Sequence, residues 1–85
     1  MKSFVYKIKD EIGIHARPAG LLVNEAKKFE STITISKGDK NAVATKLMAI
    51  MSMGVKKGDT ITITVDGSDE DKALTEMEKF FSENL

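Results

Sequence analysis

The stretch Thr60–Val65 alternates threonine with large aliphatic residues more strictly than any other part of the chain. Ile61, Ile63 and Val65 would lie on one face of an extended strand and the threonines on the other, because successive side chains of a strand point to opposite faces. A strand with one apolar face requires a sheet that is covered on that side. The stretch therefore predicts an amphipathic sheet with one packed face and one face in water.

Three further segments predict strands by the same two-residue period or by their position beside a turn, and they are residues 4–8, 31–36 and 41–44. Ile33 and Ile35 would share the covered face in the second of these segments. The sequence Lys37-Gly38-Asp39-Lys40 separates the last two segments and is typical of a turn. The two segments should therefore form a β-hairpin.

A helical period replaces the strand period from Ala16 onward. The apolar stripe of this first helix consists of Ala19, Leu22, Val23, Ala26 and Phe29. Pro18 suits the first helical turn, where its missing N–H is no loss. Lys27 and Lys28 are expected in the last turn, where cations interact favourably with the helix dipole.

A second, short helical segment carries more large apolar side chains than it can bury. They are Leu47, Met48, Ile50, Met51 and Met53, followed by Gly54. We expect some of Leu47, Met48 and Met51 to face solvent, where adaptable methionines suit a binding surface. Core packing is the alternative explanation for the stripe. Leu21 also lies off the stripe of its helix and is either a scattered surface leucine or a partner contact.

A third helical segment ends near Asn84, and its core stripe consists of Ala73, Leu74, Met77, Phe80 and Phe81. Ser68 followed by Asp71 predicts a capping box at its start. The element order is strand, helix, strand, strand, short helix, strand, helix. This order, with amphipathic strands throughout, is typical of an α+β open-faced sandwich.

Length and composition restrict the possible functions. The 85 residues predict one domain spanning residues 1–85. Thirteen basic and thirteen acidic residues cancel, which argues against broad nucleic-acid binding. One histidine and no cysteine argue against a metal site. No apolar run approaches the roughly 20 residues of a membrane span, so we expect a cytoplasmic protein without direct membrane insertion.

The segment Gly13–Ala19 contains the only histidine and the only proline of the chain. His15 is predicted where a loop becomes a helix, and the first amides of a helix attract anions because they lack internal partners. A neutral imidazole can carry a phosphoryl group. The amides of Ala16 and Arg17 and the Arg17 guanidinium would hold the phosphoryl oxygens, and Pro18 would stiffen the turn. A surface or capping histidine, or an anion-binding domain without phosphotransfer, is the alternative.

The segment 13–19 and the sequence Met51-Ser52-Met53-Gly54-Val55 resemble HPr, the histidine-containing phosphocarrier of the bacterial sugar phosphotransferase system. The resemblance covers nearly the whole chain. It implies a four-stranded antiparallel sheet with three helices on one face (βαββαβα). It also implies a phosphocarrier, not an enzyme, that works without a cofactor. Enzyme I would transfer phosphate from phosphoenolpyruvate to Nδ1 of His15 beside Arg17, and the carrier would pass it to IIA components.

The resemblance further implies a partner-binding surface formed by the first helix and the short second helix. It comprises Ala16, Gly20, Leu21, Asn24, Lys27, Leu47, Met48 and Met51. We expect a monomer that meets enzyme I and IIA components on this surface, with transcriptional regulators as possible further partners.

One position departs from the pattern of many Gram-positive HPr proteins. Their regulatory serine, the target of an ATP-dependent kinase, corresponds to Lys46 here. Lysine cannot accept this modification, so we expect no kinase regulation through this position. Thr45 would instead cap the short helix, and Thr45 and Ser52 are the alternative phosphorylation sites.

Two other roles remain open within the same resemblance. Some HPr-like paralogues act mainly by binding regulatory partners, and one branch lacks the histidine. Phosphocarriers of a nitrogen-linked pathway share the motif. The presence of His15, Arg17 and Pro18 together favours phosphotransfer.

Overall fold

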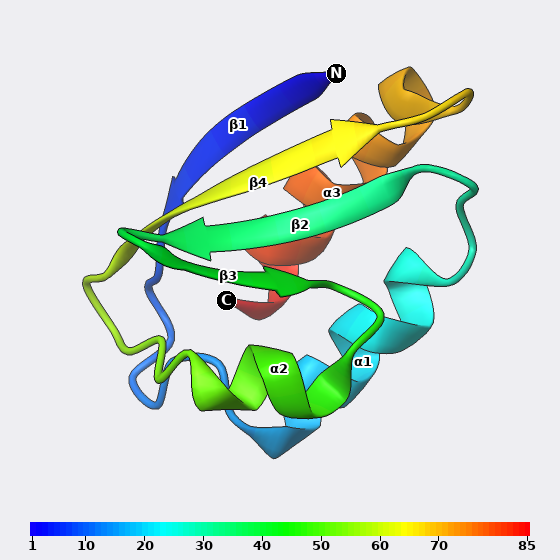
Figure 1. The fold of residues 1–85 in the computed structure, drawn as a ribbon. Coiled ribbons are helices and arrows are strands. Elements are labelled where there is room, and N and C mark those ends of the chain that lie inside the picture. Colours follow the sequence, from blue (N-terminus) through cyan, green and yellow to red (C-terminus); the bar gives the residue numbers. More distant parts are fainter.

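Four strands form one antiparallel sheet in the order β1-β4-β2-β3. In the computed structural model, which describes residues 1–85, the strands are β1 (Lys2–Lys7), β2 (Thr32–Lys37), β3 (Lys40–Val43) and β4 (Thr60–Asp66). Three helices cover one face of the sheet: α1 (Ala16–Ala26), α2 (Leu47–Ser52) and α3 (Glu70–Asn84) (Figure 1). The predicted α+β open-faced sandwich is therefore confirmed.

The most regular strand of the sequence occupies the centre of the sheet. In β4, Ile61, Ile63 and Val65 are completely buried. Ile63 lies opposite Phe4 of β1 on one side and opposite Ile35 of β2 on the other. β4 has a partner strand on both sides, and its apolar side chains lie on the face that the helices cover. The strict alternation of the sequence reflects one packed face and one face in water.

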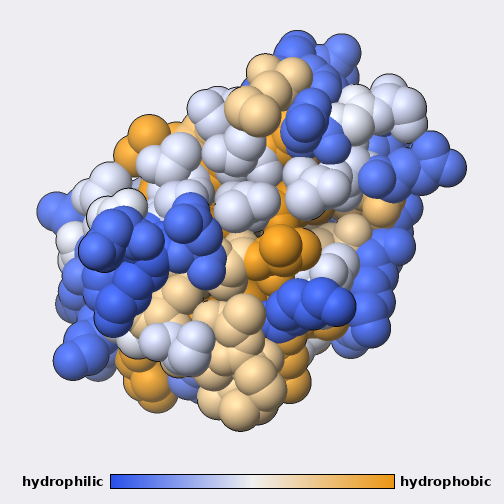
Figure 2. Space-filling view, viewed as in Figure 1, coloured by the Kyte–Doolittle hydropathy of each residue, from blue (hydrophilic) through white to orange (hydrophobic).

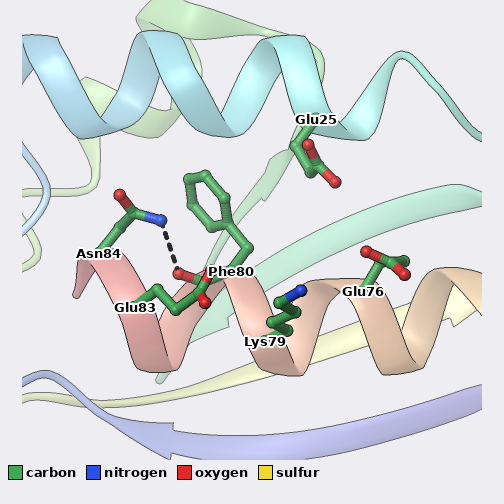
Figure 3. Close-up of a pocket in the computed structure, with 6 residues that line it drawn as sticks. All are labelled: Glu25, Glu76, Lys79, Phe80, Glu83 and Asn84. Carbon is green, nitrogen blue, oxygen red and sulfur yellow. Dashed lines mark hydrogen bonds between the residues drawn. The ribbon is translucent and has the colours of Figure 1, made fainter.

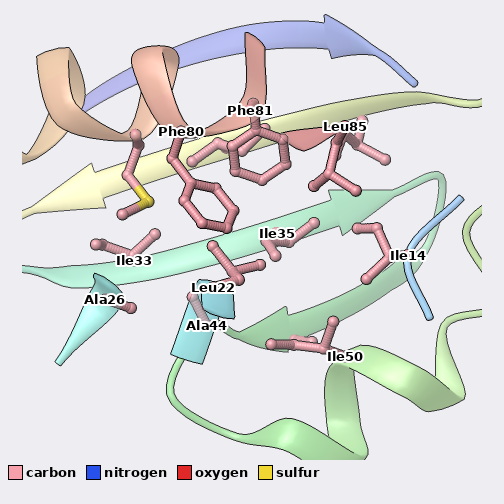
Figure 4. Close-up of a cluster of buried hydrophobic side chains, with 14 of the residues drawn as sticks. Ile14, Leu22, Ala26, Ile33, Ile35, Ala44, Ile50, Phe80, Phe81 and Leu85 are labelled. Carbon is pink, nitrogen blue, oxygen red and sulfur yellow. The ribbon is translucent and has the colours of Figure 1, made fainter. Parts of the chain in front are cut away.

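The core fills the space between the sheet and the helices. Its members come from every helix and from the covered face of the sheet, as Figure 4 shows with Leu22 of α1, Ile50 of α2 and Phe81 of α3. Phe81 packs edge-on against Phe4 and Tyr6, with ring centres 6.0 and 5.6 Å apart. The opposite face of the sheet presents mainly threonine and serine side chains (Figure 2).

The first helix ends earlier than the sequence predicts. α1 stops at Ala26 and Lys27 is its C-cap residue, so the placement of Lys27 and Lys28 in the last turn is wrong. The amide of Lys28 donates to the Glu25 carbonyl, and that of Phe29 to the Ala26 carbonyl. Both bonds span three residues, so the chain leaves the helix through a tighter turn.

The predicted capping box of the last helix is wrong as well. Asp69, not Ser68, precedes α3 as its N-cap residue, and no side chain caps the helix. The Asp69 carboxylate instead accepts hydrogen bonds from the amides of Glu30 and Ser31, each at 2.9 Å, and from the Ser31 hydroxyl. The Ser68 hydroxyl donates to Glu30. Contacts with a distant loop therefore replace the local bonds.

The short helix also begins without a side-chain cap. Lys46 is the N-cap residue of α2, so the prediction that Thr45 caps this helix is wrong. The amide of Lys46 donates to the Val43 carbonyl, which turns the chain directly from β3 into the helix. None of the three helices is both long and apolar enough to cross a membrane.

Candidate functional site

The loop that precedes His15 is held by main-chain hydrogen bonds. The amides of Lys9 and Asp10 both donate to the terminal oxygen of Leu85, at 2.6 and 2.9 Å. The Gly13 amide donates to the Asp10 carbonyl, and the Ile14 amide to the Val55 carbonyl at 3.1 Å. The loop is thus fastened at both ends to segments that are distant in the sequence.

Gly13 is required for the contact between this loop and the segment after α2. Its φ of +78° lies in the left-handed region. A Cβ atom at Gly13 would also lie 2.3 Å from the Val55 carbonyl oxygen and 2.7 Å from Cα of Lys56. Only a residue without a side chain fits both conditions, so Gly13 brings the His15 loop directly onto the backbone at Val55.

The segment Val55–Asp59 is itself anchored by an ion pair. Lys37 Nζ lies 2.8 Å from the Asp59 carboxylate and also donates to the Gly54 carbonyl at 3.2 Å. The same carboxylate accepts the Lys56 amide at 2.8 Å. The Lys37 ammonium and then the Lys56 amide hold the pKa of Asp59 below its ordinary value of 3.8. These contacts fix the surface on which the His15 loop rests.

His15 stands at the junction between this loop and α1. It is the N-cap residue, with extended backbone angles and no hydrogen bond from its side chain to the helix. The side chain is 39% exposed. The amides of Ala16 and Arg17 donate no hydrogen bond within the protein. An imidazole open to solvent therefore stands beside two free amides at the positive end of a helix dipole.

A shallow depression of about 280 Å³ contains the ring of His15. Its lining residues are Asp10, His15, Arg17, Pro18, Leu21 and Asn84. The predicted pair His15 and Arg17 thus shares one cavity, and Arg17 forms no ion pair that would occupy its guanidinium. Asp10 and Asn84 were not predicted from the sequence, because neither belongs to the His15 motif.

Asp10 is the acidic group of this depression and lies close to the ring. Its Oδ2 atom lies 3.9 Å from Nε2 of His15 and also accepts the Ile12 amide at 3.3 Å. Since the carboxylate faces Nε2, the other ring nitrogen, Nδ1, is the one that Asp10 leaves free.

A second depression, between α1 and α3, has the wrong charge for an anion. Glu25, Glu76 and Glu83 line it with one lysine, Lys79 (Figure 3). Three carboxylates would repel a phosphoryl group, whose charge at pH 7 approaches −2. Asn84, whose side-chain amide donates to the Phe80 carbonyl at 3.0 Å, lines both this cavity and the His15 depression. Only the latter suits a phosphate.

The apolar residues predicted to face solvent do so. Met48 is 74% exposed, and Leu47, Met51 and Leu21 are exposed to smaller degrees. Ile50 is the buried residue of α2, and its C-cap residue, Met53, is buried as well. α1 and α2 are in contact, and moderately hydrophobic residues gather over α2 below the paler sheet face (Figure 2). These exposed side chains lie on two adjacent helices.

The other predicted surface residues are also accessible. Ala16, Asn24 and Lys27 are exposed, and Gly20 is half-exposed with no atom near the position of a Cβ. The structure contains no cluster of three or more side chains that could hold a metal ion.

Comparison with known proteins gives consistent matches over the whole chain. A family model described as "PTS HPr component phosphorylation site" matches residues 2–83. The phosphocarrier protein HPr of Mycoplasma capricolum is 45% identical over 74 residues, which cover 87% of this chain and 83% of the relative. A solved histidine-containing phosphocarrier from a mycoplasma has a TM-score of 0.93 at 39% identity, covering 96% of this chain and 93% of the other.

A regulatory protein is among the similar structures. Crh, the catabolite repression protein of Bacillus subtilis, has a TM-score of 0.78 at 32% identity, covering 94% of this chain and 92% of the other. That structure is described as a dimer with a swapped domain. The fold is therefore shared by relatives described in different functional terms.

Proposed function

The chain belongs to the HPr family, the phosphocarriers of the phosphotransferase system, and from this we propose that His15 is the residue that carries the phosphoryl group. A phosphocarrier is not a catalytic enzyme, because it accepts and donates one group without turning over a substrate. The observation that carries the proposal is the half-exposed ring of His15 beside the free amides of Ala16 and Arg17.

In the proposed reaction, the lone pair of Nδ1 attacks the phosphorus of phosphorylated enzyme I. The P–N bond to His15 forms as the phosphorus bond to enzyme I breaks, and the bonding electrons of that bond leave with enzyme I. The phosphoryl oxygens would be held by the Ala16 and Arg17 amides and by charge-assisted hydrogen bonds from the Arg17 guanidinium. Pro18, which is buried in the first turn of α1, keeps these donors in place.

The second half of the proposed relay is transfer to the IIA components of sugar-specific enzymes II, with the phosphate originating from phosphoenolpyruvate. Both partners would bind the surface made by the adjacent helices α1 and α2, whose apolar residues Leu21, Leu47, Met48 and Met51 are exposed. The proposal includes residues 1–85 acting as one domain, as a cytoplasmic monomer.

The test uses labelled phosphoenolpyruvate and purified enzyme I. The wild-type protein should acquire acid-labile, alkali-stable label, and His15→Ala should acquire none. Because His15 is the only histidine and its side chain makes no capping bond, the variant should keep its fold, which thermal unfolding checks. An unlabelled wild-type protein, or an equally labelled variant, would refute the assignment. Lys79→Ala, in the acidic depression, is the matched control and should be labelled normally.

A regulatory role is the second candidate, and the likeness to Crh supports it. In that case the same α1–α2 surface would bind a regulatory protein such as a transcription factor, and phosphotransfer would be secondary. Binding measured with the His15→Ala variant distinguishes the two roles, because a pure binding partner would still associate with it. A nitrogen-linked phosphocarrier would be labelled by the enzyme I of that pathway instead.

A further inference from the structure

We propose that Asp10 is a positioning residue for phosphotransfer, whose carboxylate keeps the proton of the neutral imidazole on Nε2 so that the lone pair lies on Nδ1. This inference rests on the proposed role of His15. It concerns a residue outside the His15 motif, which the structure brings to the ring through the fold of the preceding loop.

The distance and direction of Asp10 suit this role. Its Oδ2 atom is 3.9 Å from Nε2, and both side chains are 39% exposed. This separation allows a charge interaction directly or a hydrogen bond through one water molecule. No other carboxylate oxygen lies within 4 Å of a ring nitrogen. Asp10 therefore acts on one ring nitrogen only.

The main chain holds Asp10 in this position. Its amide donates to Leu85 at 2.9 Å and its carbonyl accepts the Gly13 amide at 3.0 Å. The carboxylate accepts the Ile12 amide, which turns it back along the loop toward His15. Since both main-chain groups and the side chain of Asp10 are engaged, the carboxylate is preorganised, and little side-chain entropy is lost when it acts on the ring.

The charge changes of the reaction explain why a carboxylate at Nε2 should help. When Nδ1 forms a bond to phosphorus while Nε2 keeps its hydrogen, the ring acquires a positive charge that is shared with Nε2. A negative charge beside Nε2 lowers the energy of this state, as a carboxylate does for the imidazolium of a catalytic triad. The incoming phosphoryl group lies at Nδ1, away from Asp10, so repulsion between the two anions is limited.

Asp10→Asn tests the role of the charge with little disturbance of the loop, because the asparagine oxygen can still accept the Ile12 amide. Glu11→Gln is the matched control. It removes one negative charge from the same loop, and Glu11 forms no ion pair or hydrogen bond with the ring. Two measurements are made on each protein: the tautomer ratio of His15 from ¹H–¹⁵N spectra at a pH where the ring is neutral, and the rate of phosphorylation by enzyme I.

Asp10→Asn should raise the fraction of the Nδ1–H tautomer and slow phosphorylation by about two- to fivefold, the size expected for a partly exposed charge contact. Added salt should reduce the difference in rate, because exposed charges are screened. Glu11→Gln should match the wild-type protein in both measurements. Conservative Asp10→Glu should recover part of the rate.

An unchanged tautomer ratio in Asp10→Asn would overturn the proposal whatever the rate, and so would an unchanged rate. Failure of the proposed function gives a different result. If the wild-type protein is not phosphorylated at all, the role of His15 is wrong, whereas the tautomer measurement still reports whether Asp10 controls the ring.

Discussion

A side-chain carbon on Gly13 would lie 2.3 Å from the carbonyl oxygen of Val55, well inside the contact distance of the two atoms. Gly13→Ala should therefore reduce the free energy of unfolding by roughly 2–4 kcal/mol, from the left-handed φ together with the clash. Urea unfolding measures the change. Gly54→Ala is the control: its φ is also positive, at +64°, but it faces open space, so it should cost only about 1–2 kcal/mol. Equal losses in the two variants would show that the Val55 contact is unimportant.

Met48→Glu should slow phosphate exchange with enzyme I and IIA components by about five- to thirtyfold, because a charge replaces an apolar contact at the proposed interface. The side chain is 74% exposed, so the fold should be unaffected. Val5→Glu is the matched control, since Val5 is 66% exposed on the far face of the sheet. This variant should exchange phosphate at the wild-type rate. Unchanged exchange in Met48→Glu would place the interface elsewhere.

Asp69→Asn should lower the free energy of unfolding at neutral pH. The difference in this free energy between the variant and the wild-type protein should become smaller at acidic pH. The Ser31 hydroxyl, followed by the Glu30 amide, holds the pKa of Asp69 below its ordinary value of 3.8. A carboxyl with a lowered folded-state pKa stabilises the fold above its unfolded pKa, and this stability is lost as pH falls through the folded pKa. Urea unfolding of both proteins at neutral pH and below pH 3.8 measures the two free energies of unfolding. A difference independent of pH would contradict the explanation, and Asp39→Asn in the exposed hairpin turn is the control.

Incubation with ATP and the regulatory kinase of Gram-positive HPr proteins should leave this protein unmodified. Lys46 occupies the N-cap position of α2, and the Ser52 hydroxyl is engaged with the Ala49 carbonyl at 2.9 Å. Mass spectrometry detects any added phosphate. Lys46→Ser provides the positive control, because it restores a hydroxyl just before the helix. Phosphate found on Thr45 or Ser52 of the wild-type protein would refute the prediction.

Much of the fold could be predicted from the sequence, because the alternation of apolar and polar residues within each strand shows which side chains are buried. The packed face of β4 could be predicted from the alternation of Ile61, Ile63 and Val65 with threonines. The order of the elements then predicted the sandwich architecture. The ends of the helices could not be predicted in the same way. Ser68 and Asp71 have the spacing of a capping box, but Asp69 is the N-cap residue of α3. Its carboxylate accepts the amides of Glu30 and Ser31, residues that only the fold brings near.

The residues of the candidate site likewise fall into those that the sequence could predict and those that only the fold brings together. His15, Arg17 and Pro18 belong to one short stretch of the sequence, so the sequence alone could predict that they lie together, as they do in the depression. Asp10 and Asn84 reach the same depression from a loop and from the last helix. No spacing rule connects these two residues to the histidine, because their proximity depends on how α3 and the loop around Gly13 pack against the start of α1.

The proximity of α1 and α2 has a consequence for recognition. The two helices are separated in the chain by β2 and β3, so the surface they share exists only after the sheet has assembled. A peptide copied from residues 10–27 would carry the histidine but none of the methionines. Partner proteins that contact both helices would therefore not bind nascent or denatured chains. Only the folded protein would then be phosphorylated.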